Sequence, residues 1–547
     1  MSKRIDWPTF IGAFVLLLVV AVPLVLFPDA GARWVLAAKN FVTEQLGVLY
    51  LLLGVVAVGF MVYVIFSDLG QIKLGDADER PEFRTWSWAA MLFCGGIGAS
   101  ILYWSVIEWM YYIQSPPFEI EPMSNEAARW AATYGIFHWG IVTWSIYLIP
   151  SLPMAYFLHV RKRSVLKVSQ AMLPVLGDKL ANGWLGKLID ILFIFGLMAG
   201  TATTLGLAAP LINEGVHEMF GVPLGIGPQL IVLLVCTAIF GWSAWSGLKK
   251  GIKILSDINL WLALGLLVFV FVLGPTLFMA NTGLDAIGRM LSNLIRMATW
   301  TEAFGGIDGF PDSSFPQSWT MFYWAWWLVF SPTMGFFVAR ISRGRTVRQM
   351  VAGGIFFGSL GCAAFFITLG NFGLYMQLTG QLDAVSLLND QGPTAAMFAV
   401  LHELPLAWVA IAAFTILAVL FTATSFDSTS YILAAAVEKK LEGGEPMRWN
   451  RLFWAISLSI LPAILMWLGG LETLQTASVV GGLPLLPIAV LLMVSFVRAA
   501  KYDMRYQPDY SDPEIAIETF PRHDPWTEKG DWDNTGEHAS NERSNSA

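Results

Sequence analysis

Long runs of apolar residues, separated by short charge clusters or by Pro and Gly, make up most of this 547-residue sequence. A run of about 18 to 25 apolar residues is long enough to cross a hydrocarbon layer of roughly 30 Å as one α-helix. Such runs predict an all-α membrane protein with twelve transmembrane helices. Their approximate ranges are 9–28, 47–67, 85–112, 128–158, 187–212, 227–246, 252–280, 316–340, 351–377, 405–437, 451–470 and 475–498.

The composition excludes several other classes of protein. Hydrophobic residues make up 56% of the chain and charged residues 13%, whereas soluble domains carry about 25% charged residues. The net charge of −7 provides no basic stripe for a phosphate backbone, so we expect no nucleic-acid partner. Cys94, Cys236 and Cys362 lie in apolar runs without CxxC spacing, which indicates neither a disulfide framework nor a zinc site.

The basic residues predict the orientation in the membrane. With twelve spans, 28 Lys and Arg lie on the side of both termini and 5 on the other side. By the positive-inside rule both termini are cytoplasmic, as expected for a multi-pass protein of a bacterial plasma (inner) membrane. Residues 499–547 are rich in Asp, Glu, Pro, Asn and Ser, which predicts a disordered cytoplasmic tail. Residues 283–315 and 391–404 predict amphipathic helices on the outer surface, with packed loops as the alternative.

Two predicted spans carry helix-breaking residues at matching places. The third contains Cys94-Gly95-Gly96-Ile97-Gly98, and the eighth contains Ser331-Pro332-Thr333-Met334-Gly335. Such a pair of broken helices indicates an inverted-repeat transporter with a substrate site at the repeat interface. The repeats would be residues 85–282 and 316–498, preceded by two helices in residues 1–84. The alternative is that the glycines only allow close helix packing.

Aromatic residues cluster beside these positions. In the eighth span Tyr323, Trp326 or Trp327, and Phe330 share one helical face. Aromatic ring faces attract cations, and they suit quaternary ammonium or sulfonium groups, which have no N–H to donate. Most of the 24 Trp should be interface anchors or core residues. Trp326 and Trp327, however, lie in the middle of the span, where an interfacial anchor is not expected.

At these residues the sequence resembles the betaine/choline/carnitine transporter family. The resemblance rests on WTMFYWAWWLVFSPTMGFFVARISRGRTVR at 319–348, GGIGASILYW at 95–104 and IEWMYYIQSPP at 107–117, with AWSGLKKGIKILSDIN and FTATSFDSTS further on. It covers residues 45 to 500. It implies a core of two inverted five-helix repeats preceded by two helices, usually in a homotrimer. The implied substrates are glycine betaine, carnitine, choline or dimethylsulfoniopropionate.

The resemblance also implies a substrate site. The onium group would be held by an aromatic cage, and the amides of Gly95, Gly96 and Gly98 would face the substrate carboxylate. In sodium-coupled betaine carriers this stretch reads Gly-Met-Gly-Ile-Gly, and Phe330 stands where the family often has Trp or Tyr. The cage residues carried over are Trp139, Trp144, Tyr147, Trp326 and Trp327, with Tyr111 as a further wall and Trp319 or Phe330 on the access path.

The coupling ion is expected to be sodium. Thr424 and Ser425 match hydroxyls that bind sodium in coupled family members, with carbonyls near Phe421, Leu92 and Gly95 completing the shell. Adjacent helical hydroxyls can instead bond back to the preceding turn. A sodium-independent exchanger, with Met334 filling an ion site, or a proton symporter is then the alternative. The carboxylates in or near spans are Glu108, Asp190 and Asp427.

Enzymes and channels are the rival classes. The sequence has no HExxH, GxSxG or Walker motif, so we expect no catalytic residue and no organic cofactor. A channel would repeat a polar filter on several spans, and none is found. The sequence therefore predicts a secondary active transporter that imports an onium compound by alternating access.

Overall fold

The chain folds almost entirely into helices in the computed structural model, which describes residues 4–95, 98–163, 167–246, 249–441, 445–469, 471–507, 514–520 and 524–527. Short 3-10 or π-helical turns occupy Val42–Leu46, Asp68–Gln71, Tyr156–Val160, Gln170–Met172, Pro316–Thr320 and Phe366–Gly370. The α-helices are α1 (Trp7–Leu26), α2 (Pro28–Phe41), α3 (Gly47–Phe66), α4 (Thr85–Gly95), α5 (Ala99–Gln114), α6 (Asn125–His138), α7 (Ile141–Ala155), α8 (Leu173–Ala181), α9 (Trp184–Phe220), α10 (Ile226–Ser246), α11 (Lys249–Leu273), α12 (Thr276–Thr299), α13 (Met321–Ile341), α14 (Val347–Phe365), α15 (Asn371–Leu378), α16 (Ala384–Gln391), α17 (Pro393–His402), α18 (Ala407–Ala436), α19 (Arg448–Ser457), α20 (Ile460–Leu468), α21 (Leu471–Gly482) and α22 (Leu485–Met504).

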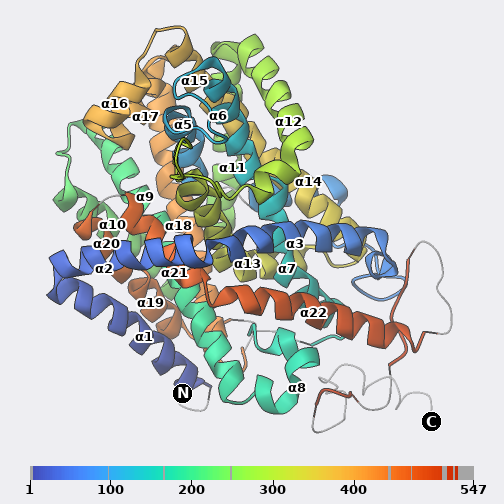
Figure 1. The fold of residues 1–547 in the computed structure, drawn as a ribbon. Helices are drawn as coiled ribbons and strands as arrows, with labels where there is room; N and C mark the ends of the chain where they lie inside the picture. Colours follow the sequence, from blue (N-terminus) through green and yellow to red (C-terminus); the bar gives the residue numbers. More distant parts are fainter. Residues whose placement is uncertain are drawn as a thin grey trace, which may run out of the picture.

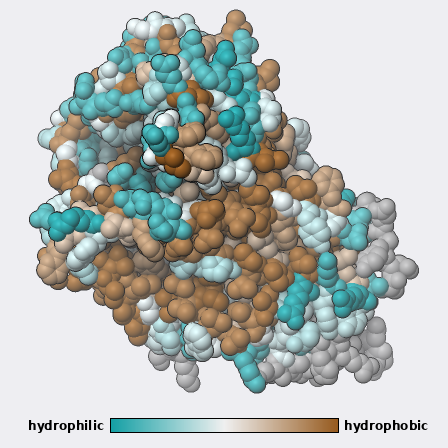
Figure 2. Space-filling model, in the orientation of Figure 1, coloured by the Kyte–Doolittle hydropathy of each residue, from teal (hydrophilic) through white to brown (hydrophobic). Residues whose placement is uncertain are grey.

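The helices confirm an all-α membrane protein. In the described part of the chain nine helices are long and apolar enough to cross a bilayer, or ten if the bent pair α11 and α12 forms one span. Helices occupy all twelve predicted ranges, but the number of crossings stays a prediction. Outer helices expose large apolar side chains, such as Val19 at 62% and Leu234 at 67%. Figure 2 shows such a continuous apolar face over α1, α3 and α22, as lipid contact requires.

Helix α13 lies at the centre of the molecule (Figure 1). It packs mainly against α7, α21, α9 and α3, and α9 in turn packs against α18 and α21. The approach of α9 to α13 depends on Gly200, where an added Cβ would lie 2.4 Å from Cγ2 of Val329. A side chain there would push the two helices apart. The predicted aromatic residues on α13 are therefore enclosed by other helices.

The predicted break in the third span is confirmed. Helix α4 ends at Gly95 and α5 begins at Ala99. Between them Gly98 has extended backbone, with φ −141° and ψ −172°. Gly96 lies outside the described residues. The chain thus leaves helical geometry within this apolar stretch, which leaves backbone groups open to other partners.

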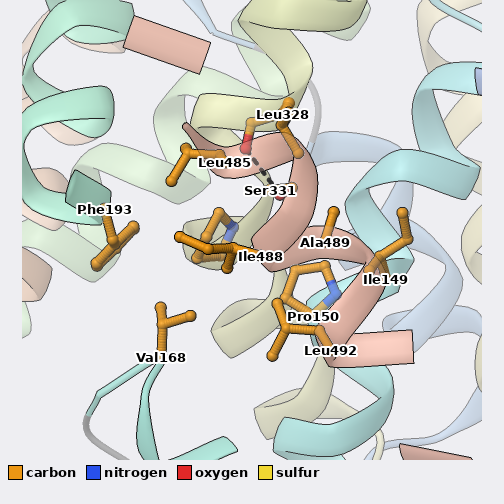
Figure 3. A pocket seen from close by; sticks show the side chains of 11 residues that line it. Ile149, Pro150, Val168, Phe193, Leu328, Ser331, Leu485, Ile488, Ala489 and Leu492 are labelled. Atoms are coloured by element: carbon orange, nitrogen blue, oxygen red, sulfur yellow. Dashed lines mark hydrogen bonds between the residues drawn. The ribbon is translucent and has the colours of Figure 1, made fainter. Parts of the chain in front are cut away.

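The predicted break at Pro332 is wrong, because α13 continues through it. Pro332 cannot donate a backbone hydrogen bond to the carbonyl of Leu328. The hydroxyl of Ser331 donates to that carbonyl instead, at 2.8 Å, as Figure 3 shows. The lost backbone bond is replaced locally, so the helix does not need to unwind. The crevice beside Ser331 in Figure 3 has a volume of only about 10 Å³.

A break that the sequence analysis did not predict lies in the fourth span. Helix α6 ends at His138, and α7 begins at Ile141. Gly140 between them has φ −102° and ψ −134°. The interruption places Trp139 at the junction of two helices, directly beside α13.

The predicted disordered tail (499–547) lies largely outside the described residues, and the described part of it packs against the helices. Helix α22 extends to Met504, and further on Ile515 pairs with Ile72 and is buried. Asp524 is 2% exposed and binds Arg163 at 2.6 Å. A few apolar side chains and the ion pairs Lys73–Glu514, Arg161–Asp524 and Arg163–Asp524 therefore hold segments of a mainly polar stretch against the rest of the protein.

Both segments predicted as surface helices contain helices, while their place on the outer surface stays a prediction. Helix α12 is bent by 110° from the last residues of α11 and begins before residue 283, while residues 300–314 are not helical. Helices α16 and α17 cover most of 391–404 and the residues before it. In Figure 1 these helices and α15 gather at the end of the molecule opposite α8 and the start of α1.

Candidate functional site

Three of the predicted tryptophans contact one another at the centre of the molecule. The rings of Trp326 and Trp327 stack with centroids 4.9 Å apart. Trp139, from the junction of α6 and α7, makes T-shaped contacts with Trp327, with centroids 4.6 Å apart and planes at 71°, and with Trp326, at 6.1 Å and 85°. All three side chains are buried. We refer to Trp139, Trp326 and Trp327 as the tryptophan cluster.

Each indole N–H of the tryptophan cluster has a protein acceptor. Trp326 donates to the carbonyl of Gly200 at 3.3 Å, and Trp327 donates to the carbonyl of His138 at 2.9 Å. Trp139 donates to a carboxylate oxygen of Glu108 at 3.2 Å. These bonds fix the orientation of the rings. They also leave ring faces and edges, and no polar atom, for a ligand to contact.

Glu108 is the centre of a buried polar network behind the cluster. It is 1% exposed, and its Oε2 also accepts from the hydroxyl of Tyr323 at 2.8 Å. Its Oε1 accepts from Tyr112 and lies 3.4 Å from Nδ1 of His138. The other ring nitrogen of His138 lies 3.1 Å from the hydroxyl of Thr320. A buried carboxylate needs such partners to offset its desolvation.

Tyr147 and Trp144, both predicted for the cage, take different positions. The ring of Tyr147 contacts Trp327 at 5.6 Å and belongs with the cluster. Trp144 contacts Tyr147 at 5.7 Å, and among the described rings it has no other aromatic neighbour. It packs against Gly358 of α14, where an added Cβ would lie 2.1 Å from the indole. Trp144 therefore reaches the cluster only through Tyr147 among the described rings, and its place in the cage stays a prediction.

Tyr111 and Trp319 form a second aromatic group with Trp104. Trp319 contacts Tyr111 at 5.1 Å and Trp104 at 5.7 Å. Trp104 joins this group to Tyr323 at 5.9 Å. The position suits an access path to the cluster. Phe330 lies instead beside Gly200 of α9, and it stacks on no described ring.

The predicted sodium residues are only partly brought together. The hydroxyl of Ser425 lies 3.5 Å from the position of a Cβ added to Gly98, so it borders the break in the third span. The hydroxyl of Thr424 donates back to the carbonyls of Leu420 and Phe421, at 2.9 and 3.2 Å, and accepts from Asn259 at 3.3 Å. Leu92 is buried in α4, and Gly95 ends this helix.

The other two carboxylates have local partners away from the cluster. Asp190 accepts from the backbone N–H and the hydroxyl of Ser169, at 3.0 and 2.8 Å. Asp427 pairs with Arg451 at 3.2 Å. These contacts give Asp190 and Asp427 a structural role, whereas Glu108 bonds directly to Trp139 of the tryptophan cluster.

Tyr323, His138 and Phe366 were missing from the predicted site. The ring of Tyr323 stacks on Trp327 at 5.6 Å and on His138 at 4.7 Å. Phe366 contacts Trp139 at 5.8 Å. The sequence held two signs of a polar group near the predicted cage: His138 directly precedes Trp139, and Glu108 interrupts an apolar run.

A comparison with protein families decides the class of this protein. The family model described as "BCCT, betaine/carnitine/choline family transporter" matches residues 8–505. The chain belongs to this family. As a BCCT protein it is a multi-pass membrane transporter of small molecules and not an enzyme, as the sequence predicts.

Two curated BCCT relatives match over most of their length. The chain is 36% identical over 484 residues to the glycine betaine transporter OpuD of Bacillus subtilis, covering 88% of this chain and 92% of OpuD. It is 33% identical over 470 residues to the transporter YeaV of Escherichia coli K12, covering 85% and 96%. A solved structure of a sodium-coupled sialic acid symporter matches with 16% identity and a TM-score of 0.39, covering 84% of this chain and 86% of that chain.

Proposed function

We propose that this BCCT protein imports a trimethylammonium or dimethylsulfonium compound: glycine betaine, carnitine, choline or dimethylsulfoniopropionate. The main support for this proposal is the tryptophan cluster, whose three indole N–H groups all donate to acceptors in the protein. Only ring faces and edges remain for a ligand. Ring faces favour a cation without N–H donors. The glycine betaine transporter OpuD, 36% identical, supports this class of substrate.

The charges around the cluster favour the same substrate. Among the described residues, no Lys or Arg stacks on or hydrogen-bonds to the tryptophan cluster. The charged group that does contact it is the carboxylate of Glu108, through Trp139. A negative group behind the rings strengthens the attraction for a cation in a low-dielectric interior. The substrate carboxylate would be held by amides of the 95–98 stretch.

Trp139 is the element that we propose to move during transport. Its ring packs against Trp327 in a T-shaped contact, so it would have to shift for a cation to reach Trp327. Trp139 sits at the junction of α6 and α7, beside the non-helical Gly140, where backbone rotation does not break a helix. Trp139 belongs to the proposed first repeat (85–282) and Trp327 to the second (316–498). A bound cation would then join the two repeats at their interface.

We propose sodium symport as the coupling. The hydroxyl of Ser425 borders the break at Gly98, and hydroxyl and carbonyl oxygens are the ligands that sodium prefers. The alternative within the same family is a proton symporter or a sodium-independent exchanger. Two observations favour this alternative: Thr424 bonds back to its own helix, and Glu108 with His138 is a buried pair that could take up a proton.

Uptake into proteoliposomes tests the substrate and the coupling together. Labelled glycine betaine would be offered with a sodium gradient, with potassium on both sides, or with a proton gradient. We expect accumulation above equilibrium only with sodium. Equal uptake in all three conditions would contradict symport and leave exchange, and accumulation driven by the proton gradient would favour Glu108 as the coupling group. Absence of saturable uptake for all four onium compounds would contradict the proposed substrate class.

A further inference from the structure

A groove of about 870 Å³ is lined by α3, by α22 and by Pro525 and Trp526 of the C-terminal segment. The two helices run side by side across the face in Figure 1, and the surface between them is largely apolar in Figure 2. Val490 and Val494 remain 46% and 47% exposed along it. An apolar groove in this position faces lipid.

One face of α22 changes from apolar to basic along the groove. Val490 and Val494 lie on this face, and Arg498, Lys501 and Arg505 follow on it at helical spacing. At 1.5 Å per residue, the face runs about 22 Å from Val490 to Arg505. One leaflet contributes about half of the roughly 30 Å hydrocarbon layer. The face is therefore long enough to run from the hydrocarbon into the headgroup region.

The basic end of the groove consists of Arg498, Lys501 and Arg505. Among the described residues, none of the three forms an ion pair, and Lys501 lies 5.8 Å from the ring centroid of Tyr63. Two nearby carboxylates are already engaged: Asp503 is bound by Arg161 at 2.6 Å, and Asp524 is bound by Arg163.

We propose that this groove binds one anionic phospholipid. Its phosphate would lie against Arg498, Lys501 and Arg505, and an acyl chain would lie along Val56, Phe60 and the valines of α22. Basic pockets between membrane helices are suited to anionic head groups, and each cation near the surface adds to the attraction.

Native mass spectrometry of the purified full-length protein tests the proposal. The protein would be titrated with phosphatidylglycerol or phosphatidylcholine carrying identical acyl chains. The test variant is Arg498→Gln/Lys501→Gln/Arg505→Gln. The charge-matched control is Lys179→Gln/Lys439→Gln/Lys440→Gln, which removes three exposed cations outside the groove. A second variant, Val494→Trp, fills the apolar part and keeps the charges.

We expect the wild-type protein to retain phosphatidylglycerol with at least about tenfold preference over phosphatidylcholine. The test variant should lose this preference and the control should keep it. Val494→Trp should weaken the binding of both lipids. Equal retention of the two lipids by the wild-type protein, or equal loss in the test and control variants, would overturn the proposal. So would a test variant that keeps its lipid preference but dissociates from oligomer to monomer, because the groove would then be an interface between copies.

Discussion

The indole N–H of Trp139 donates to the carboxylate of Glu108 at 3.2 Å, while the same ring makes a T-shaped contact with Trp327. Glu108 thus positions the ring that would have to shift for a cation to reach Trp327. Hydroxyls of Tyr112 and Tyr323 share the carboxylate. A substitution at Glu108 should therefore change substrate affinity through its effect on Trp139.

Glu108→Gln tests this link. The substitution keeps the shape but removes the charge, and a hydrogen bond to a charged group contributes about 1.5 to 3 kcal/mol. We expect glycine betaine affinity to fall about tenfold, measured by isothermal titration calorimetry. In a Trp139→Phe background the same substitution should have much less effect, because the N–H is already gone. Additive losses would show that Glu108 acts on the substrate by another route, and Glu126→Gln on the surface is the control.

Trp326→Ala and Trp327→Ala test the cluster itself. A desolvated cation–π contact contributes about 2 kcal/mol, which is more than tenfold in affinity. Each variant should lose at least this much glycine betaine binding, and Phe at either position should retain part of it. Trp408→Ala serves as the matched control, because Trp408 is 72% exposed on α18. Normal binding by both Ala variants would place the substrate elsewhere.

Thr424→Ala/Ser425→Ala tests the coupling. If sodium and substrate favour the same state, their linkage is typically 1 to 3 kcal/mol, so sodium should raise substrate affinity about 5- to 150-fold. The double variant should lose this rise and uphill uptake while exchange of labelled for unlabelled substrate continues. Thr429→Ala, one turn further along α18, is the control, since its hydroxyl only bonds back to Ser425. A sodium dependence that survives in the double variant would remove these hydroxyls from the ion site.

Asp503→Ala tests the packing of the C-terminal segment. Asp503 accepts from Arg161 at 2.6 and 2.8 Å and from the hydroxyl of Tyr156 at 2.6 Å. Removing one partner of a buried pair costs about 3 to 5 kcal/mol. We expect a clearly lower melting temperature by scanning fluorimetry. The surface pair variant Asp285→Ala should change it little, and equal shifts would mean that the buried pair contributes no more than a surface pair.

Much of the fold was predictable from the sequence, and the predictions that failed did so for physical reasons. The buried, central position of Trp326 and Trp327 was predictable, because both lie in mid-span, where an interfacial anchor is not expected. The break predicted at Pro332 is absent because the hydroxyl of Ser331 donates to the carbonyl that proline leaves without a backbone donor. The packing of Trp144 against Gly358 is a tertiary contact, which no local pattern indicates.

The tail and the network around Glu108 also depend on long-range contacts. Asp524 is buried beside Arg161 and Arg163, which both pair with it, and the composition of residues 499–547 gives no sign of this. His138 and Tyr323 come from different spans and meet only when α6 packs beside α13. Local sequence therefore predicted the elements, while the partners of buried polar groups required the folded chain.

The most direct test of cation recognition by ring faces is the affinity for a methylation series. Glycine betaine, dimethylglycine, sarcosine and glycine would each be titrated against the purified protein by isothermal titration calorimetry. Each lost methyl group exposes an N–H for which the tryptophan cluster has no acceptor, so we predict that affinity falls at every step and that glycine binds worst. Equal affinity for glycine and glycine betaine would contradict the account, because the carboxylate alone would then be recognised.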